Sequence, residues 1–109
     1  MKLTFMGAGS TVFARNLIGD CMCSEALRDS VFALYDINAK RLEESRVILE
    51  AMRKDKGGYG RIECYCGVEN RKEALKGADF VVNAVQVGLY DPCTITDFEI
   101  PKKYGLRQT

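Results

Sequence analysis

The stretch that decides the fold is Lys-Leu-Thr-Phe-Met-Gly-Ala-Gly-Ser-Thr-Val, residues 2–12. Its first five residues predict a short strand, which the Gly7-Ala8-Gly9 turn would end. From residue 12 to residue 23 the apolar side chains recur in pairs at a spacing of about 3.6 residues, which predicts a helix with one buried face. The opening of the chain is therefore expected to be a strand, a glycine turn and a helix.

Strands and helices alternate along the rest of the chain. Later strands are expected over residues 31–35, 62–66 and 79–87. Between them we expect a helix over residues 39–54 that Asn38 caps, and a short helix over residues 70–76 that ends at Gly77. The near-continuous apolar character of residues 79–87 suits a strand covered on both faces. Residues 94–104 are helical in composition, and we expect this helix to end near Ile100 or to restart with Pro101 in its first position.

This alternation predicts the α/β class, with a Rossmann-like, doubly wound parallel sheet. Four strands would take the order 3-2-1-4, so the sheet would be incomplete and residues 1–109 would form part of a single domain. The fourth strand would then be an apolar edge, which proteins avoid. We therefore expect the natural protein to continue beyond Thr109, with further strands pairing there.

Composition excludes several classes of function. The 109 residues carry 16 Lys and Arg against 15 Asp and Glu, a net charge of +1, so no basic face for nucleic acid is expected. The absence of histidine removes His-based nucleophile activation and His metal ligands from this chain. No apolar run reaches the ~20 residues of a membrane span, and no signal peptide is apparent. We expect a cytoplasmic protein without membrane or nucleic-acid partners.

The cysteines form two C-x-C pairs and one single residue: Cys21, Cys23, Cys64, Cys66 and Cys93. Paired zinc ligands are usually separated by roughly two to four residues, so this spacing is a poor match. Cys64 and Cys66 would share one face of a strand, which is the better geometry for ligands. We nevertheless expect small, largely buried residues in a reducing compartment.

Gly7, Gly9, Ser10 and Thr11 lie where a strand runs into a helix, as in dinucleotide-binding turns. The glycines would let the backbone approach a pyrophosphate, and the helix N-terminus would offer free N–H groups. Asp36 ends the second strand, where a carboxylate accepts hydrogen bonds from an adenosine ribose. Because Asp36 would repel an additional phosphate, the pattern favours NAD over NADP. A plain tight turn followed by a helix-capping acid would explain the same residues.

Two neighbouring features bear on this interpretation. Val12 occupies the third position of the glycine motif, where it should push the helix slightly off the strand. Arg41 is expected to lie too far along the second helix to offset Asp36. Asn83 and Gln86 lie near the carboxyl end of the fourth strand, the side on which such sheets bind ligands, and Asn83 would pair with backbone or with a cofactor ribose.

These residues resemble the NAD- and manganese-dependent glycosidases of glycoside hydrolase family 4, and most closely the α-galactosidase branch. The resemblance covers the whole chain, and the chain looks like the N-terminal part of a protein about four times longer. The matching stretches are KLTFMGAGSTVF (residues 2–13), ALYDI (33–37), RLEE (41–44), KEALKGAD (72–79), VNAVQVGLY (82–90) and DFEIPKKYGLRQT (97–109).

The resemblance implies a mechanism. NAD would oxidise the sugar at carbon 3, Mn²⁺ would polarise the resulting ketone, and elimination would follow before water adds and the hydride returns. It assigns the pyrophosphate turn to Gly7, Gly9, Ser10 and Thr11, the ribose acid to Asp36, and the nicotinamide side to Asn83 and Gln86. The metal ligands and the proton-abstracting Tyr of the family lie past Thr109, so we expect no catalytic or metal residue in this chain and no activity from it alone.

The resemblance also bears on substrate and assembly. Phospho-sugar branches of the family place an Arg shortly after the V-G-x-Y segment, whereas this chain has Cys93, which cannot clamp a phosphate. An unphosphorylated α-galactoside is therefore the expected small-molecule substrate, and we expect the full-length protein to be a homo-oligomer. The alternatives are a 6-phospho-glycosidase or another α-glycosidase of the family, a lactate/malate-type dehydrogenase, and a non-catalytic NAD-binding module.

Overall fold

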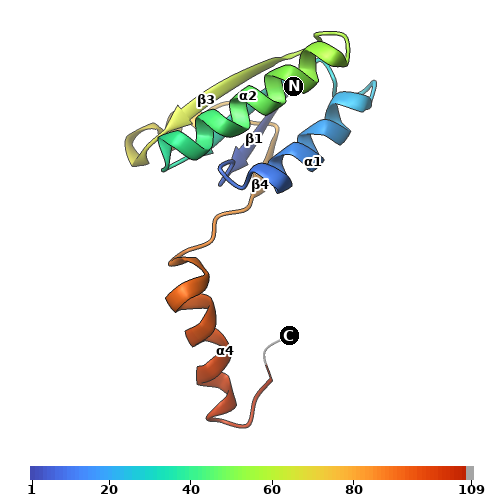
Figure 1. Cartoon of the computed structure of the whole chain (residues 1–109). Helices are drawn as coiled ribbons and strands as arrows, with labels where there is room; N and C mark the ends of the chain where they lie inside the picture. Colours follow the sequence, from blue (N-terminus) through green and yellow to red (C-terminus); the bar gives the residue numbers. More distant parts are fainter. Residues whose placement is uncertain (108–109) are drawn as a thin grey trace.

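A computed structural model of the chain describes residues 1–107, and within them four parallel strands form one sheet (Figure 1). The strands are β1 (Lys2–Met6), β2 (Val31–Asp36), β3 (Arg61–Cys66) and β4 (Phe80–Asn83). Their order in space is β3-β2-β1-β4. The predicted α/β class, the parallel sheet and its incomplete Rossmann-like order are confirmed. The last two residues of the family-like stretch 97–109 lie outside the described residues.

Helices cover both faces of the sheet. Helices α1 (Thr11–Cys23) and α2 (Ala39–Asp55) lie side by side on one face, as Figure 1 shows. On the opposite face the short turn η1 (Val68–Asn70) leads into α3 (Arg71–Leu75). Each helix joins two parallel strands, which is the crossover that a parallel sheet requires.

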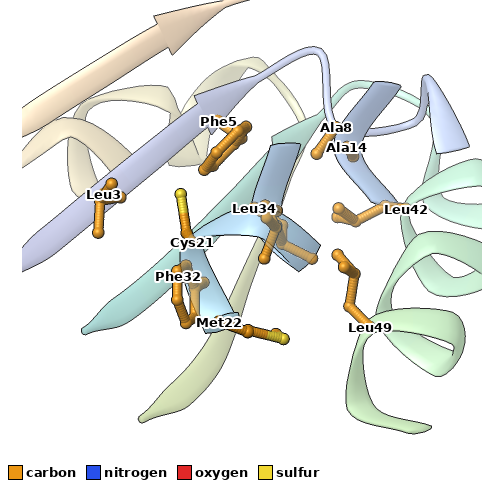
Figure 2. Close-up of a cluster of buried hydrophobic side chains, with 11 residues drawn as sticks. Leu3, Phe5, Ala8, Ala14, Cys21, Met22, Phe32, Leu34, Leu42 and Leu49 are labelled. Carbon is orange, nitrogen blue, oxygen red and sulfur yellow. The ribbon is translucent and has the colours of Figure 1, made fainter. Parts of the chain in front are cut away.

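The alternation of side chains along β1 and β2 divides the core into two layers. Phe5, Phe32 and Leu34 point toward α1 and α2, where they contact the buried side chains of both helices (Figure 2). Met6 and Tyr35 point the other way and contact Ala74 of α3. Burying each large apolar side chain stabilises the fold by about 1.5–3 kcal/mol. The larger layer therefore anchors β1 and β2, whose carboxyl ends carry the predicted site.

The fourth strand is shorter and more exposed than the sequence predicts. It ends at Asn83 rather than at residue 87, and Phe80 and Val81 are 56% and 50% exposed. The Asn83 side-chain oxygen accepts a hydrogen bond from the Val85 N–H at 3.2 Å, which turns the chain away from β1. Because three of the four residues of β4 are exposed, the prediction that both its faces are covered was wrong for the described residues.

After β4 the chain leaves the sheet (Figure 1, orange to red). An irregular turn, η2 (Leu89–Thr94), is broken by an extended Asp91 and leads into α4 (Ile95–Lys102). Helix α4 ends at Lys102, two residues past Ile100, which agrees with the expected end near Ile100. Pro101 lies in its last turn, so no new helix starts at this residue. A proline here removes only one donor near the helix end, and the Tyr104 N–H closes the turn onto the Pro101 carbonyl at 2.9 Å. None of the described helices is long and apolar enough to cross a membrane.

Candidate functional site

A cleft of about 990 Å³ opens at the carboxyl ends of β1, β2 and β4. It lies where the strand order reverses: β1 is followed in the chain by β2 on one side of it, whereas β4, reached from β3, lies on its other side. Open α/β sheets bind ligands at such a point. Six of the seven predicted site residues line it: Gly7, Gly9, Ser10, Thr11, Asp36 and Gln86. The sheet therefore brings together residues that are up to about 80 positions apart in the sequence.

Gly7 has a positive φ of 88° and forms the turn that ends β1. A Cβ atom at this position would lie 2.6 Å from the carbonyl oxygen of Ala84, in the segment after β4. The N–H groups of Gly7 and Ala8 both donate to the Tyr35 carbonyl at 2.9 Å. The backbone conformation and the approach of Ala84 thus both require glycine at position 7.

Gly9 is required for a different reason, namely the approach of a side chain. Its N–H donates to Oδ2 of Asp36 at 2.7 Å. A Cβ atom on Gly9 would lie 2.6 Å from the same oxygen and 2.9 Å from Cβ of Arg41. The second glycine of the motif therefore leaves room for the contact between the turn and Asp36.

Asp36 bridges the glycine turn and the start of α2. Its second oxygen, Oδ1, accepts a hydrogen bond from the Asn38 N–H at 2.9 Å. Helix α2 itself is capped by Asn38, which accepts from the Arg41 N–H at 3.1 Å, so Asp36 is not the capping residue. A carboxylate has about four acceptor positions, and those that these two bonds leave can accept hydroxyl groups from the cleft.

The N-terminus of α1 points into the same cleft. No side-chain hydrogen bond caps it among the described residues, and the Thr11 hydroxyl lies 3.5 Å from the Gly9 carbonyl. Uncapped N–H groups and the positive end of the helix dipole favour an anion here. Val12 is 65% exposed and does not separate α1 from the sheet, so the predicted displacement of the helix was wrong. The side chains of α1 that are buried against the sheet include Ala14 and Ile18 instead.

The structure separates the two polar residues predicted near β4. Gln86 lines the cleft, and its Nε2 donates to the Thr94 hydroxyl at 2.8 Å. Asn83 is exposed and does not line the cleft, and its oxygen is bonded to the backbone of Val85. Asn83 was expected to pair with the backbone or with a cofactor ribose, and the structure shows the backbone partner.

Two residues of α2 lie against the glycine turn, although the sequence did not place them there. Arg41 lines the cleft beside Gly9, so the expectation that it lies too far along the helix was wrong. Ser45 is 1% exposed, and its hydroxyl donates to the Ala8 carbonyl at 2.7 Å. Ser45 lies between Leu42 and Leu49 on the buried face of α2. A hydroxyl on an otherwise apolar helix face could have indicated, from the sequence, a residue with a buried hydrogen bond.

Two cysteines lie on α1 and two on β3, as predicted, and all five are free thiols. The expectation that they are largely buried was wrong: only Cys21 is buried, while Cys23 and Cys64 are exposed. Burial raises the pKa of Cys21 and of Cys64 above the ordinary value of a thiol. Within residues 1–107 no group of three or more acidic or cysteine side chains is placed to hold a metal ion.

A family model for family 4 glycosyl hydrolases matches residues 2–109. The chain belongs to this family. It is 55% identical, over 99% of its length, to an alpha-galactosidase of Bacillus subtilis (strain 168). It is 34% identical over its full length to an alpha-galacturonidase of Thermoanaerobacterium saccharolyticum, and 32% identical over 98% to an alpha-glucosidase of Erwinia rhapontici.

The chain spans about a quarter of the length of these relatives, 24%, 23% and 23% in turn. Their names differ in the sugar but share the glycosidase activity and the α configuration. The family match agrees with the resemblance seen in the motifs.

Proposed function

We propose that this chain is the NAD-binding part of a family 4 glycosidase that hydrolyses α-galactosides. One observation carries the proposal: the glycine turn, the uncapped N-terminus of α1 and Asp36 meet in a single cleft at the carboxyl ends of the strands. A cleft of about 990 Å³ is at the upper end of the ~300–1,000 Å³ range of small-molecule sites, which suits an elongated dinucleotide.

The residues present fit the parts of a dinucleotide. The N–H groups of the first turn of α1, with the hydroxyls of Ser10 and Thr11, would hold the pyrophosphate. The acceptor positions of Asp36 that remain free would take the hydroxyls of the adenosine ribose. Gln86, which lines the cleft on the β4 side, would lie toward the nicotinamide. Asn83 would act indirectly, by turning the segment that carries Gln86.

The chemistry that bound NAD supplies in this family is reversible hydride transfer at carbon 3 of the sugar, as the resemblance implies. This differs from the two-carboxylate route of most glycosidases. The contribution of residues 1–107 is to bind and orient the dinucleotide. We propose that Mn²⁺ and the proton-abstracting base are held by other residues of the full-length protein.

The α-galactoside substrate rests on the 55% identity to an alpha-galactosidase, since the relatives at 32–34% identity carry the names of other sugars. Cys93 supports an unphosphorylated sugar, because it offers no positive charge to a phosphate. A 6-phospho-glycosidase is the alternative. We also propose a homo-oligomeric full-length protein, which light scattering would test.

Titration of the protein with NAD and with NADP tests the cofactor part of the proposal. We expect NAD to bind more tightly than NADP. If neither dinucleotide binds, the cofactor part of the proposal is refuted. The substrate part is tested by assaying the full-length protein on aryl α-galactosides, α-glucosides and α-galacturonides with NAD and Mn²⁺ added. The highest kcat/KM is expected for the α-galactoside, and a higher value for either other sugar would move the assignment to that sugar.

A further inference from the structure

We propose that Ser45 is a positioning residue that holds the Ala8–Gly9 peptide group in the orientation needed to bind a dinucleotide. This inference rests on the proposed NAD site. Ser45 is buried on α2 and does not line the cleft, so it would act through the turn rather than touch the ligand. Its hydroxyl donates to the Ala8 carbonyl at 2.7 Å. Among the described residues, no backbone N–H outside the helix and strand hydrogen bonds donates to that carbonyl, so Ser45 is its partner.

The opposite edge of the same peptide group is bonded to Asp36. The N–H of Gly9 donates to Oδ2 of Asp36 at 2.7 Å, so Ser45 and Asp36 hold the carbonyl and the N–H of one planar unit. Because the peptide group is rigid, these two bonds together fix its rotation about the chain axis. Glycine at position 9 would otherwise allow that rotation at little cost.

The orientation of this peptide group sets the direction of the groups that follow it. The Ser10 N–H donates to the Gly7 carbonyl at 3.1 Å, and Thr11, which follows, begins α1 and lines the cleft with the first N–H group of the helix. The Ser45 hydroxyl is also 3.4 Å from the Thr11 hydroxyl. Without Ser45 the buried Ala8 carbonyl loses its partner and the turn can rotate, so we expect roughly tenfold weaker NAD binding.

Thr4 provides a matched control. It is fully buried on β1, and its hydroxyl donates to the Ala74 carbonyl at 2.9 Å, on the α3 face and away from the glycine turn. Ser45→Ala and Thr4→Val therefore each remove one buried hydroxyl from one backbone carbonyl. Both variants should lower the midpoint of urea unfolding, whereas Ser45→Ala alone should affect the turn.

The experiment compares wild type, Ser45→Ala and Thr4→Val by NAD titration and by hydrogen exchange of the Gly9 amide. We expect Ser45→Ala to weaken NAD binding roughly tenfold and to accelerate Gly9 exchange beyond its effect on slowly exchanging core amides. Thr4→Val should leave NAD affinity unchanged and accelerate Gly9 and core amides alike. If Ser45→Ala does not fold, Ser45→Cys keeps the volume with a much weaker donor and allows the same comparison.

The outcomes separate this inference from the proposed function. Equal NAD affinity in wild type and Ser45→Ala overturns the positioning role alone, as does an equal loss of affinity in Ser45→Ala and Thr4→Val. Wild-type protein that binds no dinucleotide refutes the proposed function, and the inference with it.

Discussion

The carboxylate of Asp36 accepts a hydrogen bond from the backbone N–H of Gly9, with 2.7 Å between Oδ2 and the nitrogen. The two residues come from the ends of adjacent strands and are 27 positions apart in the sequence. A charged acceptor makes this a strong hydrogen bond, so it fixes the glycine turn against the end of β2. The acid proposed to bind the ribose thus also shapes the turn proposed to bind the pyrophosphate.

Replacing Asp36 with Ala is expected to weaken NAD binding by about 1–3 kcal/mol, the scale of hydrogen bonds to a charged group. The variant should also discriminate less between NAD and NADP, because the carboxylate that repels the additional phosphate is gone. Calorimetric titration of both dinucleotides measures both effects. Equal affinities of the wild type for NAD and NADP would contradict the assignment of Asp36.

Asp79 offers the control for this substitution. Its carboxylate accepts a hydrogen bond from the Lys2 N–H, also at 2.7 Å, but at the opposite end of the strands. Asp79→Ala removes the same type of bond without touching the cleft, so it should leave both affinities unchanged. A similar loss of NAD binding in the two variants would trace the effect to general destabilisation.

Replacing Gly9 with Ala is expected to weaken NAD binding and to lower the free energy of unfolding by about 1–3 kcal/mol, the usual cost of overpacking. The added methyl group would meet both Asp36 and Arg41. Gly19→Ala on α1 is the control, since its methyl group would meet only the flexible end of Met52, at 2.7 Å. Alanine gains roughly 1 kcal/mol of helix propensity there, so Gly19→Ala should be neutral or stabilising in urea unfolding.

Replacing Val12 with Ala is expected to change the free energy of unfolding by less than about 0.5 kcal/mol, as is typical of exposed positions. Val12 projects from the first turn of α1 into solvent, although its place in the glycine motif suggests a contact between helix and strand. The free energies of unfolding of Val12→Ala and Ala14→Val are measured in urea. Ala14→Val enlarges a buried residue of the same helix and should destabilise the protein. A large decrease in the free energy of unfolding of Val12→Ala would show that the Val12 side chain is packed against other residues.

The first half of the fold could be predicted because its signals are local. Apolar spacing and the glycines at positions 7 and 9 mark β1, the turn and α1, and Asp36 marks the end of β2. The strand order then followed from the doubly wound arrangement that alternating strands and helices adopt. Because β1 and β2 are parallel neighbours in that arrangement, their carboxyl ends bring Asp36 and the glycine turn to one edge of the sheet, which the structure confirms.

The remainder depends on contacts that no local pattern records. Residues 84–87 continue the apolar run of β4, yet Asn83 bonds to the Val85 backbone and ends the strand. Arg41 and Ser45 reach the glycine turn only because α2 packs beside α1. Sequence spacing places both on the helix, but it cannot show which part of the chain lies opposite them.

The full-length protein is expected to prefer an α-galactoside over its 6-phosphate. Cys93 carries no charge, and a phosphate dianion that enters a partly dry pocket without a cation loses its hydration and gains no charge-assisted bond. Cys93 is half-buried, and its Sγ faces Gly88, which lines the cleft. Cys93 itself does not line the cleft, so position 93 adjoins it only through Gly88.

Cys93→Arg is accordingly expected to raise kcat/KM for the 6-phosphate relative to the plain sugar, through a charge-assisted contact. Cys93→Gln is the matched control, because it lengthens the side chain without adding charge and should not favour the phosphate. If the wild type already prefers the 6-phosphate, the phospho-glycosidase alternative replaces the proposed substrate. If the wild type prefers the plain sugar and Arg gains no more than Gln, the preference stands but its origin is not position 93.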